Sequence, residues 1–151
     1  MLSKRDIFMC GILAFLLFSF TNLVPIYAAD TTDQILTHIE EILKGNPLKS
    51  GEKVQMIKVA EDDAITFFIA RIVESSEVKP HFHKTHDEIV YVIKGSGQML
   101  INNKWFDIKP GSVHFNPMTK VHSIKNTGNE ELIIISIFTP AMKEPDRYFV
   151  Q

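Results

Sequence analysis

Between residues 53 and 138 apolar side chains recur with a period of two, in short runs separated by turn residues. This is the spacing of a β-strand, because successive side chains of a strand point to opposite faces. The intervening segments are rich in Gly, Asn, Asp, Ser and Pro, which favour turns. The pattern predicts nine strands, at residues 54–59, 65–73, 78–83, 88–94, 98–101, 105–108, 113–115, 121–125 and 132–138. Because no helical segment separates them, an all-β antiparallel sandwich or barrel is expected.

The segment before the first strand has helical periodicity instead. Residues 31–34 read Thr-Thr-Asp-Gln, which is the Thr-x-x-Gln form of a helix capping box. Apolar residues then recur at helical spacing until Gly45-Asn46-Pro47 ends the run. The pattern predicts one short amphipathic α-helix with an apolar face made of Ile35, Leu36, Ile39, Ile42 and Leu43. His38, at the border of this face, is predicted to be a half-exposed surface residue.

The first 29 residues have the three parts of a secretory signal peptide. Lys4 and Arg5 form a positive head, residues 7–20 are almost wholly apolar, and small residues at 28 and 29 precede Asp30. The sequence therefore predicts export to the periplasm or the medium, with cleavage between Ala28 and Asp30. The alternative is an uncleaved signal that anchors the chain in a membrane. The apolar run is nevertheless shorter than the ~20 residues that span a bilayer as a helix.

Composition limits the classes of partner. The 16 basic and 18 acidic residues give a net charge of −2, which argues against a nucleic-acid-binding surface. The one cysteine, Cys10, lies in the predicted leader, so no disulfide framework is expected. A small-molecule ligand is the expected partner, with no membrane contact after the leader is removed. The predicted organisation is a signal peptide (1–29), a helix and linker (30–50), a barrel (51–142) and a C-terminal tail (143–151).

Two histidines stand two residues apart on the strand predicted at 78–83. His81 and His83 therefore project from the same face of that strand. Glu88 begins the next strand, after a loop short enough to bring it back beside the pair, and the other residues on its face are valines. An isolated carboxylate on an apolar inward face costs on the order of several kcal/mol. The three side chains therefore predict a metal site with open positions, or else a polar cluster with another explanation.

Two later histidines, His114 and His122, are candidates for a further imidazole. His114 lies between Val113 and Phe115, and if these two face the interior, alternation turns His114 towards solvent. His122 shares its face with Ile124, which is consistent with an inward direction. A surface location is therefore predicted for His114, and its replacement by alanine is expected to leave metal content and melting temperature nearly unchanged.

Two segments resemble the conserved motifs of the cupin superfamily. Residues 81–95 carry the pattern His-x-His-x4-Glu-x6-Gly of the first motif, and residues 111–126 carry the pattern Gly-x5-Pro-x4-His-x3-Asn of the second. With the flanking strands, the resemblance covers about residues 50–140. Ser75 and Thr119 stand where the motifs usually have Gly. Both are turn positions, so these departures concern loop geometry more than the ligand set.

The resemblance implies a small jelly-roll barrel, or double-stranded β-helix, in which His81, His83, Glu88 and His122 coordinate one divalent metal ion. Three imidazoles and one carboxylate leave one or two positions for water or substrate, and suit Fe(II), Mn(II), Ni(II), Co(II), Cu(II) or Zn(II). The resemblance also implies a dioxygenase, isomerase or lyase that acts on a small organic molecule, with Glu88 as the candidate catalytic residue. The alternative is a non-catalytic protein whose metal anchors a carboxylate or a sugar.

The remaining candidates have ordinary structural interpretations. Residues 132–138 are apolar on both faces of the strand, so the N-terminal helix or a second subunit of a homodimer is expected to cover the outer face. The other predictions are a solvated loop position or a place near the ligands for His86, an outward Tyr91, one inward residue of Trp105 and Phe106, core packing for Phe67, Phe115 and Met118, and an undetermined facing for Arg71.

Overall fold

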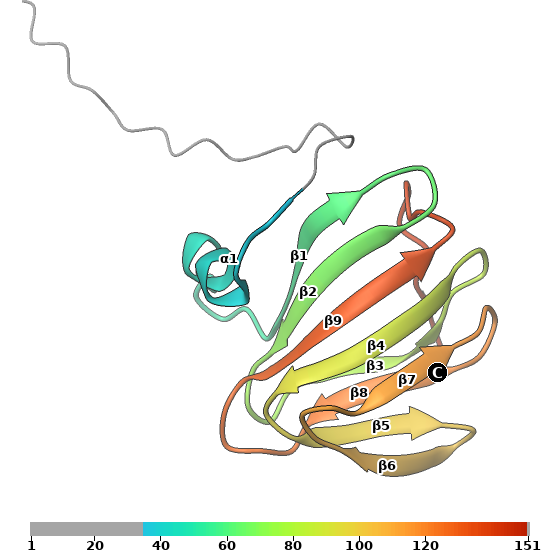
Figure 1. Ribbon diagram of the computed structural model, residues 1–151. Coiled ribbons are helices and arrows are strands. Elements are labelled where there is room, and N and C mark those ends of the chain that lie inside the picture. Colours follow the sequence, from blue (N-terminus) through green and yellow to red (C-terminus); the bar gives the residue numbers. More distant parts are fainter. Residues whose placement is uncertain (1–34, 151) are drawn as a thin grey trace, which may run out of the picture.

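The computed structural model describes residues 35–150 (Figure 1). The predicted signal peptide and the capping box at residues 31–34 lie outside the described residues. Within the described part of the chain, no helix is long and apolar enough to cross a membrane.

The described residues form two five-stranded antiparallel sheets and one short helix (Figure 1). The first sheet has the strand order β1-β2-β9-β4-β7, and the second has the order β10-β3-β8-β5-β6. The predicted all-β jelly-roll with one short helix is confirmed, and all nine predicted strands are present. The elements are α1 (Ile39–Gly45), β1 (Val54–Glu61), β2 (Thr66–Ile72), β3 (Glu77–Phe82), β4 (Asp87–Lys94), β5 (Gly97–Ile101), β6 (Lys104–Ile108), β7 (Val113–Asn116), β8 (His122–Asn126), β9 (Leu132–Thr139) and β10 (Tyr148–Phe149).

The apolar core lies between the two sheets. Ile72, Val92 and Leu132 contribute to it from the first sheet, and Met99 and Ile124 from the second. Each of these side chains is at most 5% exposed, and full burial of such a side chain contributes roughly 1.5–3 kcal/mol. Alternation along each strand directs every second residue into this space. The same rule places the polar residues of the candidate site inside the barrel.

The helix is shorter than the sequence pattern predicts. It begins at Ile39, with the exposed His38 as its N-cap, and none of its residues is fully buried. Ile35 and Leu36, predicted on its apolar face, are 47% and 95% exposed and lie outside it. A seven-residue helix has little stability of its own. Within the described residues, Ile35 and Leu36 are not buried against another element, so no tertiary contact stabilises a further helical turn before Ile39.

The predicted outward direction of His114 is wrong. Strand β7 pairs with β4 so that His114 lies opposite Val90, which is 2% exposed and points inward. Directly opposed residues of an antiparallel pair share a face, so His114 also points into the barrel. Val113 and Phe115, which the prediction placed inside, are 69% and 53% exposed. In this edge strand the apolar residues lie on the outer face, so hydrophobicity does not identify the inner one.

The outer face of the first sheet is only partly covered. Ile69 of β2 and Ile133 of β9 are buried on this face. Figure 1 shows α1 beside β1 and β2, and Arg71 of β2 donates a hydrogen bond to the carbonyl oxygen of Asn46 just after the helix. Towards β4 and β7 the same face is open, and Ile89, Tyr91, Val113 and Phe115 are exposed. The homodimer expected to cover this face stays a prediction.

The two turn positions that depart from the cupin motifs adopt a backbone conformation that favours glycine. Ser75 has φ 57° and Thr119 has φ 66°, both in the left-handed region. The amide of Thr119 nevertheless donates to the carbonyl oxygen of His83 at 2.7 Å. The turns therefore keep the glycine-type geometry without glycine.

Candidate metal centre

Three histidines meet inside the barrel at the junction of β3 and β8. His81 lies on β3, His83 directly follows it, and His122 begins β8, where the strand pairing sets it opposite His81. All three are buried: His81 is 3% exposed, His83 2% and His122 3%. One ring nitrogen from each lies within 4.8 Å of the other two. The three histidines form a cluster that could hold a metal ion.

Backbone hydrogen bonds orient all three imidazoles in the same way. The Nδ1 of His81 lies 2.8 Å from the carbonyl oxygen of Lys79, the Nδ1 of His122 lies 3.0 Å from that of Lys120, and the Nδ1 of His83 contacts that of Asp146. A carbonyl oxygen can only accept, so each Nδ1 carries the hydrogen and each Nε2 keeps a free lone pair. This is the arrangement in which a histidine ligates a metal through Nε2.

The Nε2 atoms lie near one another and near the carboxylate of Glu88, but a neutral Nε2 cannot hydrogen-bond to a carboxylate oxygen, because both are acceptors. Those of His83 and His122 are buried without a hydrogen-bond partner. Buried polar atoms are usually satisfied, so two such atoms pointing at one place indicate a group that would complete them. The donor set therefore fits a divalent transition-metal ion.

Glu88 lies beside the three histidines on β4. Its Oε2 is 3.1 Å from the Nε2 of His122 and 4.0 Å from the Nε2 of His83. The side-chain amide of Asn116, opposite Glu88 on β7, donates to the same oxygen at 2.9 Å. Burial would raise the pKa of Glu88, but the contacts with His122, His83 and Ser136 outweigh it and lower the pKa to about 2. The carboxylate is therefore ionised at neutral pH.

The protonation of the histidines suits ligation. Burial lowers the pKa of His81 from 6.5 to about 3, with further contributions from His122, Arg147 and His83. Burial also lowers the pKa of His83. Both imidazoles are therefore neutral at pH 7, which is the form that binds a metal.

Mild acid should destabilise the metal-free protein. As the pH falls below 6.5, the unfolded chain protonates His81 while the folded chain does not, because its folded pKa is about 3. The unfolded state then binds more protons, so the free energy of unfolding decreases as the pH falls. This one group should remove about 1.4 kcal/mol per pH unit.

Chemical denaturation of chelator-treated protein, at several values from about pH 7.5 down to about pH 5.5, measures this effect. A His81→Gln variant should show a shallower pH dependence than the wild type. Denaturation midpoints that do not change over this range would contradict the expected burial of a neutral His81.

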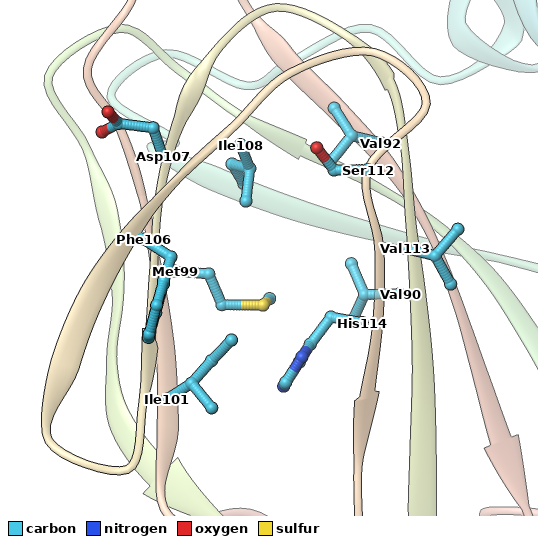
Figure 2. Close-up of a pocket in the computed structure, with 10 residues that line it drawn as sticks. All are labelled: Val90, Val92, Met99, Ile101, Phe106, Asp107, Ile108, Ser112, Val113 and His114. Atoms are coloured by element: carbon cyan, nitrogen blue, oxygen red, sulfur yellow. The ribbon is translucent and has the colours of Figure 1, made fainter.

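A cavity of about 290 Å³ lies between β4, β7, β5 and β6, and Glu88 is not among the residues that line it. Its lining does not include the three clustered histidines, but Val90 follows Glu88 on the same inward face and Ile101 pairs with His122. Figure 2 shows His114 projecting into this cavity towards Ile101 and Met99. The Nε2 of His114 contacts the Oδ1 of Asn116, so a hydrogen-bonded chain runs from the cavity through Asn116 to Glu88.

His86 is not a solvated loop residue. It is 7% exposed, and its Nδ1 lies 2.7 Å from the Oδ2 of Asp146, with its Nε2 3.3 Å from the carbonyl oxygen of Ala141. The carboxylate of Asp146 also accepts from the backbone amides of Lys84 and Thr85. His86 therefore fastens the C-terminal tail to the loop between β3 and β4, and the carbonyl of Asp146 in turn orients His83.

The tail is the part of the site that the sequence pattern does not reveal. Residues 143–151 are predicted only as a C-terminal tail, and within them Tyr148 and Phe149 form β10 and pair with Phe82 and His81 of β3. Asp146 and Arg147 precede this strand and reach the site. The only sequence signal is the short apolar run at its end, which is too brief to predict a strand.

The other candidates are distributed as follows. Tyr91 is exposed as predicted, and Phe106 is the aromatic residue of its pair that lines the cavity. Phe115 and Met118 are exposed rather than packed in the core, which corrects that prediction, because β7 turns Phe115 outward and Met118 lies in the following turn. Arg71 lies outside the barrel in a bidentate ion pair with Glu131.

Comparison with known proteins connects this geometry to a family. The model of the Cupin domain matches residues 68–138. An uncharacterised protein of Aquifex aeolicus is 33% identical over 113 residues, which cover 75% of this chain and 90% of that protein. A glucose-6-phosphate isomerase of Thermococcus onnurineus is 32% identical over 112 residues, covering 65% of this chain and 58% of the enzyme.

An oxalate-binding protein of Thermotoga maritima is 39% identical over 62 residues, covering 41% of this chain and 51% of that protein. The chain therefore spans little more than half the length of these two named relatives. Among solved structures, one described as a predicted oxalate decarboxylase of Thermotoga maritima is 30% identical. It has a TM-score of 0.55 and covers 58% of this chain and 80% of that one.

Proposed function

The chain belongs to the cupin family, and on that premise we propose that it is a metal-dependent enzyme acting on a small organic molecule. The observation that supports this most directly is the pair of buried Nε2 atoms without partners, on His83 and His122, inside an apolar barrel. They lie next to an ionised Glu88, and the barrel also holds a cavity of about 290 Å³. A polar cluster that served only the fold would have its buried atoms satisfied.

His81, His83, His122 and Glu88 are the residues that would hold the ion. When bound, a divalent metal would supply Lewis-acid polarisation of a substrate oxygen. The set suits Fe(II), Mn(II), Ni(II), Co(II), Cu(II) or Zn(II), so affinity order alone does not select among them. Three of these residues lie on strands whose register is fixed by pairing, and His83 directly follows one of them, so the site is built on rigid elements.

The residues around the centre favour a proton-transfer reaction, of isomerase or lyase type. Glu88 is ionised and its Oε2 accepts a hydrogen bond from Asn116, so one carboxylate oxygen has a fixed position from which it could accept a proton. The apolar walls of the cavity, among them Val90, Met99 and Ile101, limit the access of water. The glucose-6-phosphate isomerase relative is consistent with this reaction class.

The test is metal analysis of the protein as isolated, followed by turnover assays. The substrate panel should contain phosphorylated sugars and small organic acids, with oxygen-uptake assays on catechols, flavonols and thiols. Glu88→Gln should lower turnover by far more than it lowers metal content, because it removes the proton acceptor. Glu144→Gln, an exposed change in the tail, is the control and should leave turnover unchanged. If Glu88→Gln loses metal and turnover to the same extent, Glu88 acts only as a metal ligand.

A second candidate is a non-catalytic protein in which the metal anchors a carboxylate or a sugar. The similarity to an oxalate-binding protein favours this alternative. The two functions predict different outcomes in one assay. A binding protein retains its ligand unchanged over hours, whereas an enzyme releases product.

We also propose that the chain is exported, on the pattern of residues 1–29 alone. Amino-terminal sequencing of protein recovered from the producing cells would show a start near Ala29 or Asp30. Recovery of Met1 in the membrane fraction would favour the uncleaved anchor.

A further inference from the structure

Arg147 of the tail points into the barrel beside the histidine cluster. Extending the β10–β3 pairing by one residue sets Arg147 opposite His83, because Tyr148 lies opposite Phe82 and Phe149 opposite His81. Opposed residues share a face, so Arg147 lies on the same face as the two histidines. Tyr148 stacks on Phe82 on the other face, with ring centroids 5.5 Å apart.

The guanidinium of Arg147 spans the space between β10 and the inner face of β1. Its Nη2 lies 3.0 Å from the Sδ of Met56, a residue that packs against the core. The pairing with β3 sets the residue beside His83, and the contact with Met56 shows that its side chain extends across the inner face. Arg147 therefore lies on the His81 and His83 side of the centre.

The hydrogen-bonding capacity of Arg147 is almost unused. Its Nε is buried and has no partner, and a thioether sulfur is a weak acceptor for its Nη2. No carboxylate within residues 35–150 forms an ion pair with it. Arg71, by contrast, has both Nε and Nη2 on the carboxylate of Glu131. Arg147 is half-buried, and partial desolvation of a guanidinium without a counterion is costly, a cost that a bound anion offsets.

We propose that Arg147 binds the carboxylate of a small organic acid next to the metal centre, which deepens the proposed function and rests on it. The Nε and Nη2 edge of a guanidinium matches the two oxygens of a carboxylate and donates two parallel hydrogen bonds. One guanidinium also balances the single negative charge of a carboxylate better than the larger charge of a phosphate. The substrate or ligand class is therefore a small carboxylic acid.

The test is calorimetric titration with oxalate, the smallest dicarboxylate, and with acetate, succinate and inorganic phosphate. Metal-loaded and chelator-treated protein are both titrated. Arg147→Gln should weaken carboxylate binding by roughly 10- to 100-fold, which is the loss expected for a charge-assisted pair. Arg147→Lys should bind carboxylates more tightly than Arg147→Gln and more weakly than the wild type, because lysine keeps the charge but cannot form the bidentate pair. Arg71→Gln is the matched control and should bind carboxylates as the wild type does.

Metal content and melting temperature separate this proposal from the proposed function. Arg147→Gln should keep its metal and melt at the same or a higher temperature, because it removes a half-buried charge that has no counterion. A residue with only a structural role would instead lower the melting temperature when replaced. If the wild type holds no metal, the proposed function fails, while Arg147-dependent carboxylate binding to the metal-free protein would still support the anion site. Three results would overturn the carboxylate site at Arg147. They are an unchanged carboxylate affinity in Arg147→Gln, a preference of the wild type for phosphate, and no carboxylate binding by the wild type.

Discussion

Replacing His122 by alanine should abolish stoichiometric metal binding or weaken it by orders of magnitude. The β3–β8 pairing fixes His122 opposite His81, and the carbonyl of Lys120 holds its Nδ1 so that Nε2 faces the cluster. That Nε2 is buried and lies 3.1 Å from the Oε2 of Glu88, to which a neutral imidazole with its hydrogen on Nδ1 cannot donate. Removing the imidazole takes away one of four protein ligands at a buried site, so the two histidines and the carboxylate that remain should hold the ion far more weakly. Metal analysis of the purified variant measures the loss.

His114→Ala is the matched control for that experiment. His114 also points into the barrel, but its Nε2 is directed to Asn116 and not to the cluster. Its replacement should therefore leave metal content near the wild-type level. Because His114 is half-buried and hydrogen-bonded, the variant should lose roughly 1 kcal/mol of stability, more than a surface substitution would. If His114→Ala loses its metal and His122→Ala retains it, the third imidazole ligand is His114 and the assignment to His122 is wrong.

The strands and the histidine pair could be predicted because both depend on local alternation. A period of two identifies a strand whatever its partner, and it places His81 and His83 on one face without reference to the rest of the fold. Glu88 followed from the length of one short loop. The proximity of His122 depends on the pairing of β3 with β8, two strands distant in sequence. Alternation with Ile124 indicates only its inward direction, and the resemblance to cupins is what selects it as a ligand.

The errors occur where hydrophobicity no longer reports burial. Val113 and Phe115 are apolar and exposed, because β7 is an edge strand whose outer face has no cover within the described chain, so alternation was assigned with the wrong sign. The predicted helix is present, but it begins at Ile39, after Ile35 and Leu36, and Leu36 is apolar and 95% exposed. A pattern of apolar residues indicates a periodicity, but it does not say which face is buried.

The tail could not have been predicted, because its contribution depends on single polar contacts at long range. Asp146 contacts Thr85 and His86 across some 60 residues of sequence. No periodicity marks such a contact. Arg147 is likewise an isolated cation in the sequence and acquires its place only through the two-residue strand that follows it.

Replacing Asp146 by alanine should destabilise the protein by about 3 kcal/mol or more, which is the cost of leaving buried donors without their charged partner. Asp146 is 6% exposed. Its carboxylate accepts hydrogen bonds from the backbone amides of Lys84 and Thr85, the Thr85 hydroxyl and the His86 ring. Burial would raise the pKa of Asp146, but these hydrogen bonds outweigh it and hold the pKa well below its usual range. The carboxylate is therefore ionised and paired throughout the neutral range, and its full contribution to stability is present there.

The same change should reach the metal centre. Without its carboxylate, Asp146 no longer fastens the tail, and its carbonyl oxygen loses its fixed position on the Nδ1 of His83. Loss of such an orienting contact typically lowers metal affinity by roughly 10- to 100-fold. Thermal melts and metal titrations of Asp146→Ala, beside the exposed Glu144→Ala from the same tail, measure both effects. If Asp146→Ala has the melting temperature of the wild type, or is less stable but keeps the full metal affinity, the tail does not position His83.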